Sequence, residues 1–244
     1  MREVVTVVIP IFSETPSKSQ IHSLESVQSH LGDYPITFIK GENLKPNPVF
    51  NEICSDADFV GFDSRYFACE SGYTRFLLSG TLYQLFGWSR YLLVCELNTL
   101  IQKNELGYWC RQGYDFIQPK PPVGSISKST FDWRRRVDPL SVLDTLRSAS
   151  QTTTLESGIS LRKVDVFQKL CGRNRRLAAR FLAAQPSATN DSLFWEVVPN
   201  RWLPDLLVPH EIQRKHFAQY VTFADGANAP NENPFATTGF IGVG

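Results

Sequence analysis

The sequence lacks a dominant charge and a long apolar run. Its 25 lysines and arginines nearly balance its 24 aspartates and glutamates, so the net charge is only +1. A protein whose main partner is nucleic acid usually carries a basic excess, and we therefore expect no nucleic acid partner. No apolar stretch approaches the roughly 20 residues that a membrane-spanning helix needs.

The chain also lacks the spacings that mark disulfide frameworks and zinc sites. Its five cysteines are odd in number and include no C-x-x-C pair, and its four histidines have no ligand-like spacing. Glu3 directly precedes the apolar residues 4–9, an order typical of a first strand and not of a secretory signal. We therefore expect a reduced, cytoplasmic protein without structural zinc.

A chain of 244 residues with 42% hydrophobic content can bury one sizeable core, which favours a single domain. Short apolar segments alternate with segments of helical periodicity, and this alternation predicts an α/β fold. The tail from residue 228, rich in Gly, Pro, Asn and Thr, predicts a loop. The predicted strands are residues 4–9, 36–39, 59–62 and 91–95, and the predicted helices are 19–31, 73–86, 140–148 and 164–170.

Polar residues follow the predicted buried strand at 91–95. Glu96 and Asn98 come at its end, and alternate positions on an extended chain point the same way. Because open α/β folds bind ligands at the carboxyl edge of the sheet, we expect both side chains to face one ligand. On spacing alone, Glu96 could equally cap a helix or meet water in a loop.

Later segments have the chemistry of a turn and of a helix start. Gly158 suits a tight turn, and the helix predicted after it offers unpaired N–H groups to an anion or a sugar hydroxyl. Asn190 and Asp191 precede an apolar run, which is favourable N-cap chemistry. Residues 121–154 are expected to form a surface excursion, or lid, that closes over a ligand.

Several separated motifs occur in one order along the chain. They are VVIPIF at 7–12, GYTRFLLS at 72–79, YLLVCELN at 91–98, NELGYWCRQGYDFI at 104–117, ESGISLRK at 156–163, NDSLFW at 190–195 and NPFATTGF at 233–240. In these motifs the chain resembles a family of largely uncharacterised bacterial and fungal proteins assigned to the glycosyltransferase type A fold. The resemblance implies a single α/β domain of Rossmann type, with a mainly parallel central sheet flanked by helices. Residues 1–120 would bind the nucleotide-sugar, and residues 155–244 would form the acceptor side.

The implied reaction moves a sugar from a nucleotide-sugar donor to a hydroxyl of a saccharide or lipid-linked saccharide acceptor, in surface polysaccharide or glycolipid synthesis. This chemistry needs a nucleoside pocket, stabilisation of the departing diphosphate and a base for the acceptor. Arg75 offers bidentate donors to the diphosphate, although on its own it could be a solvated position on a helix. The implied donor-binding residues are Pro10, Ile11, Phe12, Tyr73, Arg75, Glu96 and Asn98.

The resemblance also implies residues for the acceptor side. Asp191 matches an acidic segment that opens a helix beside the acceptor in inverting enzymes of this fold, which makes it the implied general base; plain N-capping is the alternative. Glu156 and Ser157 could also form a simple strand-to-helix turn. The implied acceptor-binding or sugar-binding residues are Asp115, Glu156, Ser157 and Gly158.

The chain departs from the family pattern where a metal would bind. The family has Gln-Leu-Asp as its counterpart of the D-x-D signature, whereas this chain has Glu96-Leu97-Asn98. An amide oxygen brings no charge to a hard divalent ion, which argues against a Mn²⁺ or Mg²⁺ requirement. A His that is common after Pro-Phe in the last motif is also missing, since Ala236 follows Phe235. We therefore expect no required cofactor, with Glu96 and Asn98 as the ligands of any metal.

Two alternatives stay open at this point. The same departure is compatible with an inactive protein that keeps the fold and binds sugar or nucleotide without turnover. Basic residues that cluster in the second half of the chain form a solvated face, or else hold the protein at the inner face of a membrane. These residues are the arginines at 134–136 together with Arg173, Arg175, Arg176 and Arg180.

Overall fold

The computed structural model describes residues 3–119, 158–184, 191–200, 205–221 and 233–239. The helices are α1 (Lys18–Leu31), α2 (Val49–Ile53), α3 (Glu70–Ser79), α4 (Thr81–Leu85), α5 (Leu106–Arg111), α7 (Val164–Ala184), α8 (Ser192–Val197) and α9 (Glu211–Phe217), with a 3₁₀ turn at Ser64–Tyr66. The strands are β1 (Glu3–Ile11), β2 (Ile36–Gly41), β3 (Asp58–Phe62), β4 (Ser89–Cys95), β5 (Thr99–Ile101), β6 (Phe116–Ile117), β7 (Ile159–Lys163), β8 (Ala218–Tyr220) and β9 (Ala236–Thr238).

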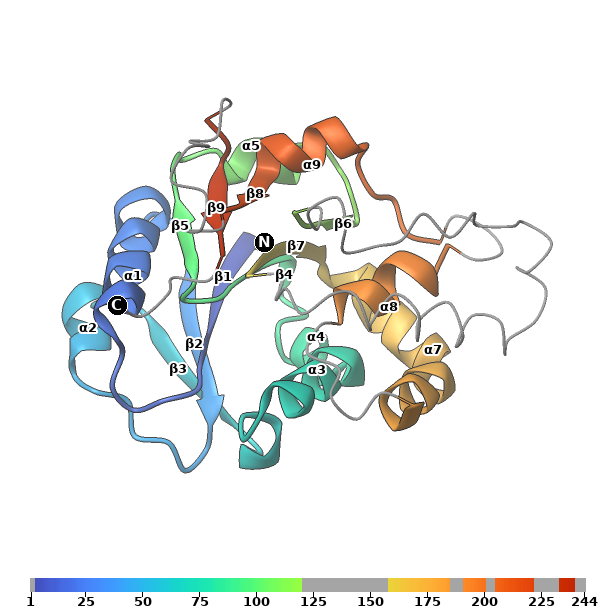
Figure 1. Cartoon of the computed structure of the whole chain (residues 1–244), viewed down its shortest axis with the longest axis horizontal. Coiled ribbons are helices and arrows are strands. Elements are labelled where there is room, and N and C mark those ends of the chain that lie inside the picture. The colour runs from blue at the N-terminus through green and yellow to red at the C-terminus, as the bar shows by residue number, and fades with distance from the viewer. Residues whose placement is uncertain (1–2, 120–157, 185–190, 201–204, 222–232, 240–244) are drawn as a thin grey trace.

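These strands form a large and a small sheet (Figure 1). Among the described residues, the large sheet has six strands in the order β3-β2-β1-β4-β7-β6, and the small sheet has three in the order β5-β9-β8. In the large sheet β1 is parallel to β2 and β4, and β2 is parallel to β3. Strand β7 is antiparallel to both β4 and β6, so it alone runs against the others. The predicted α/β fold with a mainly parallel sheet is confirmed.

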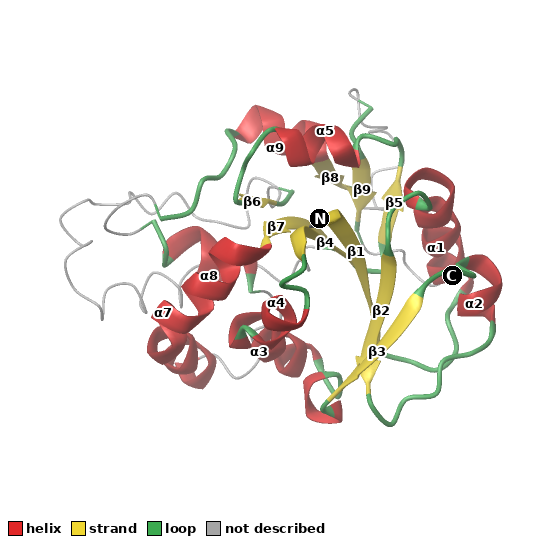
Figure 2. Cartoon of the chain, turned by 180° about the vertical axis from the view of Figure 1, so that it is seen from behind, coloured by secondary structure: helices red, strands yellow, loops and turns green. Residues whose placement is uncertain are grey.

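Both faces of the large sheet are covered, which explains why its strands are apolar at consecutive positions. Val7 and Ile9 of β1 point into a core formed with α1, α2 and α5, whereas Val8 points to the opposite core formed with α3, α4, α7 and α8. Figure 2 shows these two groups of helices on either side of the sheet. Helix α1 begins with a capping box, in which Ser17 and Gln20 each bond the other's backbone N–H.

Several element boundaries differ from the sequence prediction. The helix predicted over 73–86 is two helices, because Gly80 takes a left-handed conformation (φ 84°) between α3 and α4. Strand β1 continues through Pro10 to Ile11, past its last pair with β4 at Val8, so the missing N–H of proline is tolerated there. The helix predicted over 164–170 extends to Ala184 as α7.

The prediction of a loop for the tail is wrong at residues 236–238. Strand β9 pairs with both β5 and β8, and Phe235 and Ala236 are buried in the core. The helix predicted at 140–148 and the surface excursion at 121–154 lie outside the described residues. Across the described ranges, no helix combines the length and hydrophobicity that crossing a membrane requires.

Candidate functional site

The carboxyl edge of the large sheet brings together the ends of β1 and β4. Val8 of β1 is level with Val94 of β4, so two residues further on Pro10 is level with Glu96. Pro10 and Ile11 are buried, whereas the Phe12 side chain that follows is 45% exposed. The edge therefore presents an exposed aromatic ring beside a half-buried carboxylate, both from segments named in the sequence analysis.

The Phe12 ring packs against aromatic residues from α3 and the segment before it. It meets Tyr73 edge-on with ring centroids 5.1 Å apart, and Phe67 at 5.8 Å. Tyr73 is only 5% exposed, and its hydroxyl has no hydrogen-bond partner among the described residues. Burial raises the pKa of Tyr73 well above its usual value, and the nearby charge of Glu96 adds to this. The phenol is therefore held protonated, as a hydrogen-bond donor beside Glu96.

Segments from three parts of the chain meet at Gly158. Its backbone has φ 58°, and a Cβ there would lie 2.9 Å from the Asn98 side-chain oxygen and clash with the hydroxyl of Thr238. The Glu96 N–H donates to the Gly158 carbonyl at 2.6 Å, and the Thr99 hydroxyl donates to Asn98 Oδ1 at 3.3 Å. The structure therefore brings Glu96, Asn98 and Gly158 together, and adds Thr238.

Thr238 was not predicted as a site residue. It lies in the last of the motifs that carried the resemblance, but nothing local distinguishes it from Thr237. Its position depends on the pairing of β9 with β5, where Thr238 is level with Thr99. That pairing joins residues 139 positions apart, as the hydrogen bond between the two hydroxyls shows.

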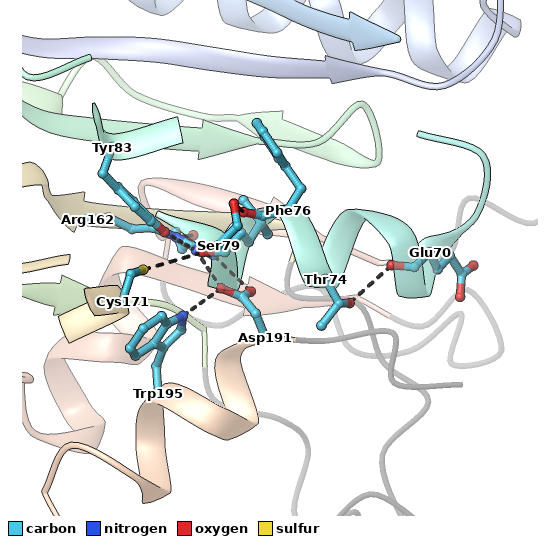
Figure 3. A network of polar contacts seen from close by, with 11 residues as sticks. Glu70, Thr74, Phe76, Ser79, Tyr83, Arg162, Cys171, Asp191 and Trp195 are labelled. Carbon is cyan, nitrogen blue, oxygen red and sulfur yellow. Dashed lines mark hydrogen bonds and ion pairs between the residues drawn. The ribbon is translucent and has the colours of Figure 1, made fainter. Parts of the chain in front are cut away.

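Beside this edge lies a buried ion pair between Arg162 of β7 and Asp191, which precedes α8 (Figure 3). Arg162 Nη1 lies 2.6 Å from Asp191 Oδ2, and Nη2 lies 3.1 Å from Oδ1. Trp195 donates its indole N–H to Asp191 Oδ2 at 2.8 Å, and Arg162 Nη1 also lies 2.8 Å from the Tyr83 hydroxyl. The Arg162 and Asp191 side chains are 0% and 2% exposed.

The guanidinium of Arg162 is held in an aromatic environment. It lies 5.6 Å from the ring centres of both Phe116 and Phe167, and its Nε donates to the Ser160 hydroxyl. Burial alone lowers the pKa of Arg162, but the Asp191 carboxylate and the Tyr83 hydroxyl outweigh this and raise the pKa above its usual value. Arg162 is therefore a permanent cation, and its charge is balanced by Asp191.

The position of Asp191 bears on both roles considered for it. It occupies the N-cap position of α8, but its side chain makes no capping hydrogen bond. The N-cap prediction is therefore wrong in its chemistry, because the carboxylate binds Arg162 and Trp195 instead. The general-base role stays a prediction.

Asp115 lies away from the carboxyl edge. Its Oδ1 accepts from Lys163 Nζ at 2.9 Å, and its Oδ2 accepts from the Leu207 N–H at 3.0 Å. Lys163 is level with Tyr91, at the opposite end of β4 from Glu96. The structure therefore does not bring Asp115 together with Glu96, and its role in acceptor binding stays a prediction.

Arg75, Glu156 and Ser157 complete the predicted set. Arg75 is exposed on α3, and no described residue forms a hydrogen bond or ion pair with it. Glu156 and Ser157 lie outside the described residues.

The residues at the carboxyl edge do not make a metal site by themselves. In the described part of the chain, no group of three or more His, Cys, Asp or Glu converges on one point. Glu96 supplies one carboxylate, and the Asn98 oxygen already accepts from Thr99. Mg²⁺ is usually held by one or two carboxylates together with substrate phosphates, and Glu96 could supply such a carboxylate, so the expectation that no metal is required stays a prediction.

The chain is similar in structure to glycosyltransferases over nearly its whole length. A structure of the galactosyltransferase LgtC with donor and acceptor sugar analogues matches 96% of this chain and 86% of its own, with a TM-score of 0.57 and 10% identity. An active-site mutant of LgtC gives a TM-score of 0.58 at 10% identity over 98% and 88%. Mouse xyloside xylosyltransferase 1 gives 0.55 at 9% identity over 97% of both chains.

These likenesses define the class of fold, which is that of the type A glycosyltransferases. At the level of sequence, a family described as protein of unknown function (DUF5672) matches residues 56–237, and the chain belongs to that family. No curated protein sequence matches the chain.

Proposed function

We propose that this protein is a glycosyltransferase that moves a sugar from a nucleotide-sugar donor to a hydroxyl acceptor. In this reaction the acceptor oxygen bonds to the anomeric carbon, the bond from that carbon to the diphosphate oxygen breaks, and the hydroxyl proton passes to a base. The observation that carries the proposal is the meeting of Phe12, Tyr73, Glu96, Asn98 and Gly158 at one edge of the sheet. Open α/β folds bind their ligands at that edge.

Each of these residues has a property suited to the donor. The exposed ring of Phe12 offers a stacking face to the nucleobase. The Tyr73 phenol, protonated and without a partner among the described residues, can donate to the donor sugar or to its diphosphate. Arg75 supplies a guanidinium with which no described residue pairs, and its fork of N–H donors suits phosphate oxygens.

The finer assignments are also proposals. We assign the reaction as inverting, with Asp191 as the base, in the synthesis of a surface polysaccharide or glycolipid. That role requires the acceptor hydroxyl to reach a carboxylate that now binds Arg162 and Trp195. The protein would act in the cytoplasm, with the exposed arginines of α7 as its contact with an anionic membrane surface.

A second candidate function is supported by two specific observations. Asn98 stands where the family pattern that the chain resembles has an aspartate, and the implied base, Asp191, is neutralised by a buried arginine. A protein with these features could bind a nucleotide or a nucleotide-sugar without catalysing transfer.

Thermal unfolding with a panel of nucleoside diphosphates and nucleotide-sugars, each with EDTA and with Mn²⁺, tests donor binding. A ligand present at 100 times its Kd stabilises by about 2.7 kcal/mol, which corresponds to roughly 5–10 °C for a domain of this size. We expect a base-selective shift that persists in EDTA and is reduced in Arg75→Ala. Arg176→Ala, an exposed arginine on α7, is the matched control.

Release of nucleoside diphosphate in the presence of acceptors then separates the two candidates. An enzyme turns over and loses turnover by orders of magnitude in Asp191→Asn, whereas an inactive binding protein shows the thermal shift without turnover. If no nucleotide shifts the transition, both candidates are wrong.

A further inference from the structure

A cavity lies at the far end of the small sheet from the candidate donor site. It has a volume of about 380 Å³, and the described residues that line it come from the loop after β5, from α5, from α9 and from the segment before β9. Helices α5 and α9 lie side by side there, over the small sheet (Figure 1). The volume falls in the range of roughly 300–1,000 Å³ that is usual for small-molecule sites.

The small sheet separates this cavity from the candidate donor site. At one end of the β5–β9 pair, Thr99 is level with Thr238, next to Asn98 and Gly158. At the other end the two strands lead to Lys103 and Asn233, both of which line the cavity. Strand β5 (Thr99–Ile101), which lies between these two ends, by itself spans roughly 10 Å. The cavity is therefore a separate site and uses none of the residues assigned to the donor.

Aromatic rings form part of the cavity wall. Tyr108 is 48% exposed, and its ring meets Trp109 edge-on at 5.2 Å. Trp109 in turn packs against Phe217 of α9, which fixes its position. The Trp109 indole N–H is buried and has no hydrogen-bond partner among the described residues. The wall thus offers a rigid aromatic surface on which the C–H face of a ring can lie.

Amide groups supply directed hydrogen bonds in the same cavity. Gln213 uses its Oε1 to accept from the Tyr114 hydroxyl at 2.7 Å and from the His210 N–H at 3.3 Å. Its amide N–H donors therefore have no partner among the described residues, and the same holds for the side chain of Asn233. These groups suit a ligand that is rich in oxygen atoms.

Lys103 and Glu105 balance each other's charge in the cavity, which His216 also lines. Lys103 lies 3.7 Å from Glu105, so neither charge faces the cavity without a counter-ion. A phosphate or other anion would meet the Glu105 carboxylate together with the Lys103 cation. An uncharged ligand leaves this pair intact.

We infer that this cavity binds a neutral saccharide, whose hydroxyl groups meet the amides of Gln213 and Asn233 and whose apolar ring face lies on Tyr108. The inference goes beyond the proposed function and does not depend on it, since a saccharide can bind here whether or not the protein transfers sugar. It gives the protein a carbohydrate-binding site that is separate from the candidate donor site.

Saturation-transfer NMR tests the inference with neutral mono- and disaccharides of glucose, galactose, mannose and N-acetylglucosamine at millimolar concentration. We expect at least one of them to bind, and Tyr108→Ala and Asn233→Ala each to weaken its affinity about tenfold. Trp88→Ala removes an aromatic ring of similar exposure outside the cavity and should leave the affinity unchanged. Both Tyr108 and Trp88 are exposed, so an unchanged melting temperature confirms that the variants fold.

The outcomes separate this inference from the proposed function. Arg75→Ala, which weakens nucleotide binding if the proposed function is right, should leave saccharide binding intact. The inference is overturned if no saccharide of the panel binds, or if binding survives Tyr108→Ala and Asn233→Ala unchanged. Displacement of the saccharide by inorganic phosphate or by a dipeptide would also overturn it, because the cavity would then take a charged ligand.

Discussion

Replacing Arg162 with methionine should strongly destabilise the protein. The substitution leaves the carboxylate of Asp191 fully buried without a cation, and the Tyr83 hydroxyl loses its partner at 2.8 Å. Removing one partner of a buried ion pair typically costs about 3–5 kcal/mol. At roughly 2–4 °C per kcal/mol for a domain of this size, the melting temperature should fall by about 6–20 °C.

An exposed Arg–Asp pair with the same shortest N–O distance provides the matched control. Arg173 Nη1 lies 2.6 Å from Asp205 Oδ2, the same distance as in the buried pair, but these side chains are 63% and 41% exposed. Exposed pairs contribute about 0–1 kcal/mol, so Arg173→Met should change the melting temperature by only a few degrees.

Urea denaturation of Arg162→Met, of Asp191→Leu and of the double variant Arg162→Met/Asp191→Leu measures the coupling between the two charges. The double variant removes both charges, so it should be more stable than Arg162→Met alone, although Tyr83 and Trp195 lose their partners. If Arg162→Met costs no more than Arg173→Met, or if the double variant is as unstable as the sum of the single variants, the buried charge does not govern stability here.

Further expected outcomes concern the site and the thiols. Gly158→Ala should lower the free energy of unfolding more than Gly113→Ala, as measured by urea denaturation, and should also impair nucleotide binding. Both glycines have positive φ, which costs about 1–2 kcal/mol for alanine, but only at Gly158 would the added Cβ clash with Thr238. Phe12→Ala should weaken nucleotide affinity about tenfold in calorimetric titration, with Trp88→Ala as the control. In the folded protein a thiol reagent at pH 8 should label Cys69 first, because a hydrogen bond from Ser71 lowers its pKa, whereas the other four cysteines are buried. Burial raises the pKa of the Cys54 thiol to about 11 and the pKa values of Cys95, Cys110 and Cys171 to about 12. Because these thiols lose their protons at lower pH in the unfolded chain than in the folded protein, the free energy of unfolding should fall as pH rises above about 9. A urea series across pH 8–11 that shows rising stability would contradict this.

Local apolar patterns were sufficient to locate the main strands of the large sheet. The segments predicted at 36–39, 59–62 and 91–95 lie within β2, β3 and β4. Strands β2 and β4 are buried at most positions and are therefore apolar along their length, whereas the edge strand β3 is only partly buried. The first helix was located in the same way, within one residue at its start. The placement of Glu96 and Asn98 at the strand end followed directly from the end of the apolar run.

Boundaries that depend on backbone conformation or on distant partners were not visible in the sequence. The apolar periodicity of residues 73–86 continues across Gly80, where the chain changes direction between two helices. Residues 236–238 have no apolar run, and they form a strand only because β5 and β8 lie on either side. A polar segment can become buried when its backbone hydrogen bonds are supplied by neighbours that are remote in sequence.

The sequence by itself determined the α/β fold class, the positions of the main strands along the chain and the polar positions after β4, since these depend on periodicity and on local apolar runs. The tertiary structure alone decided that Asp191 faces Arg162, that Thr238 lies against Gly158, and that Asp115 sits at the other edge of the sheet. Each of these contacts joins residues that are far apart in the chain. Sequence patterns report the environment that one residue needs, whereas the identity of its partner depends on how the sheets and helices pack.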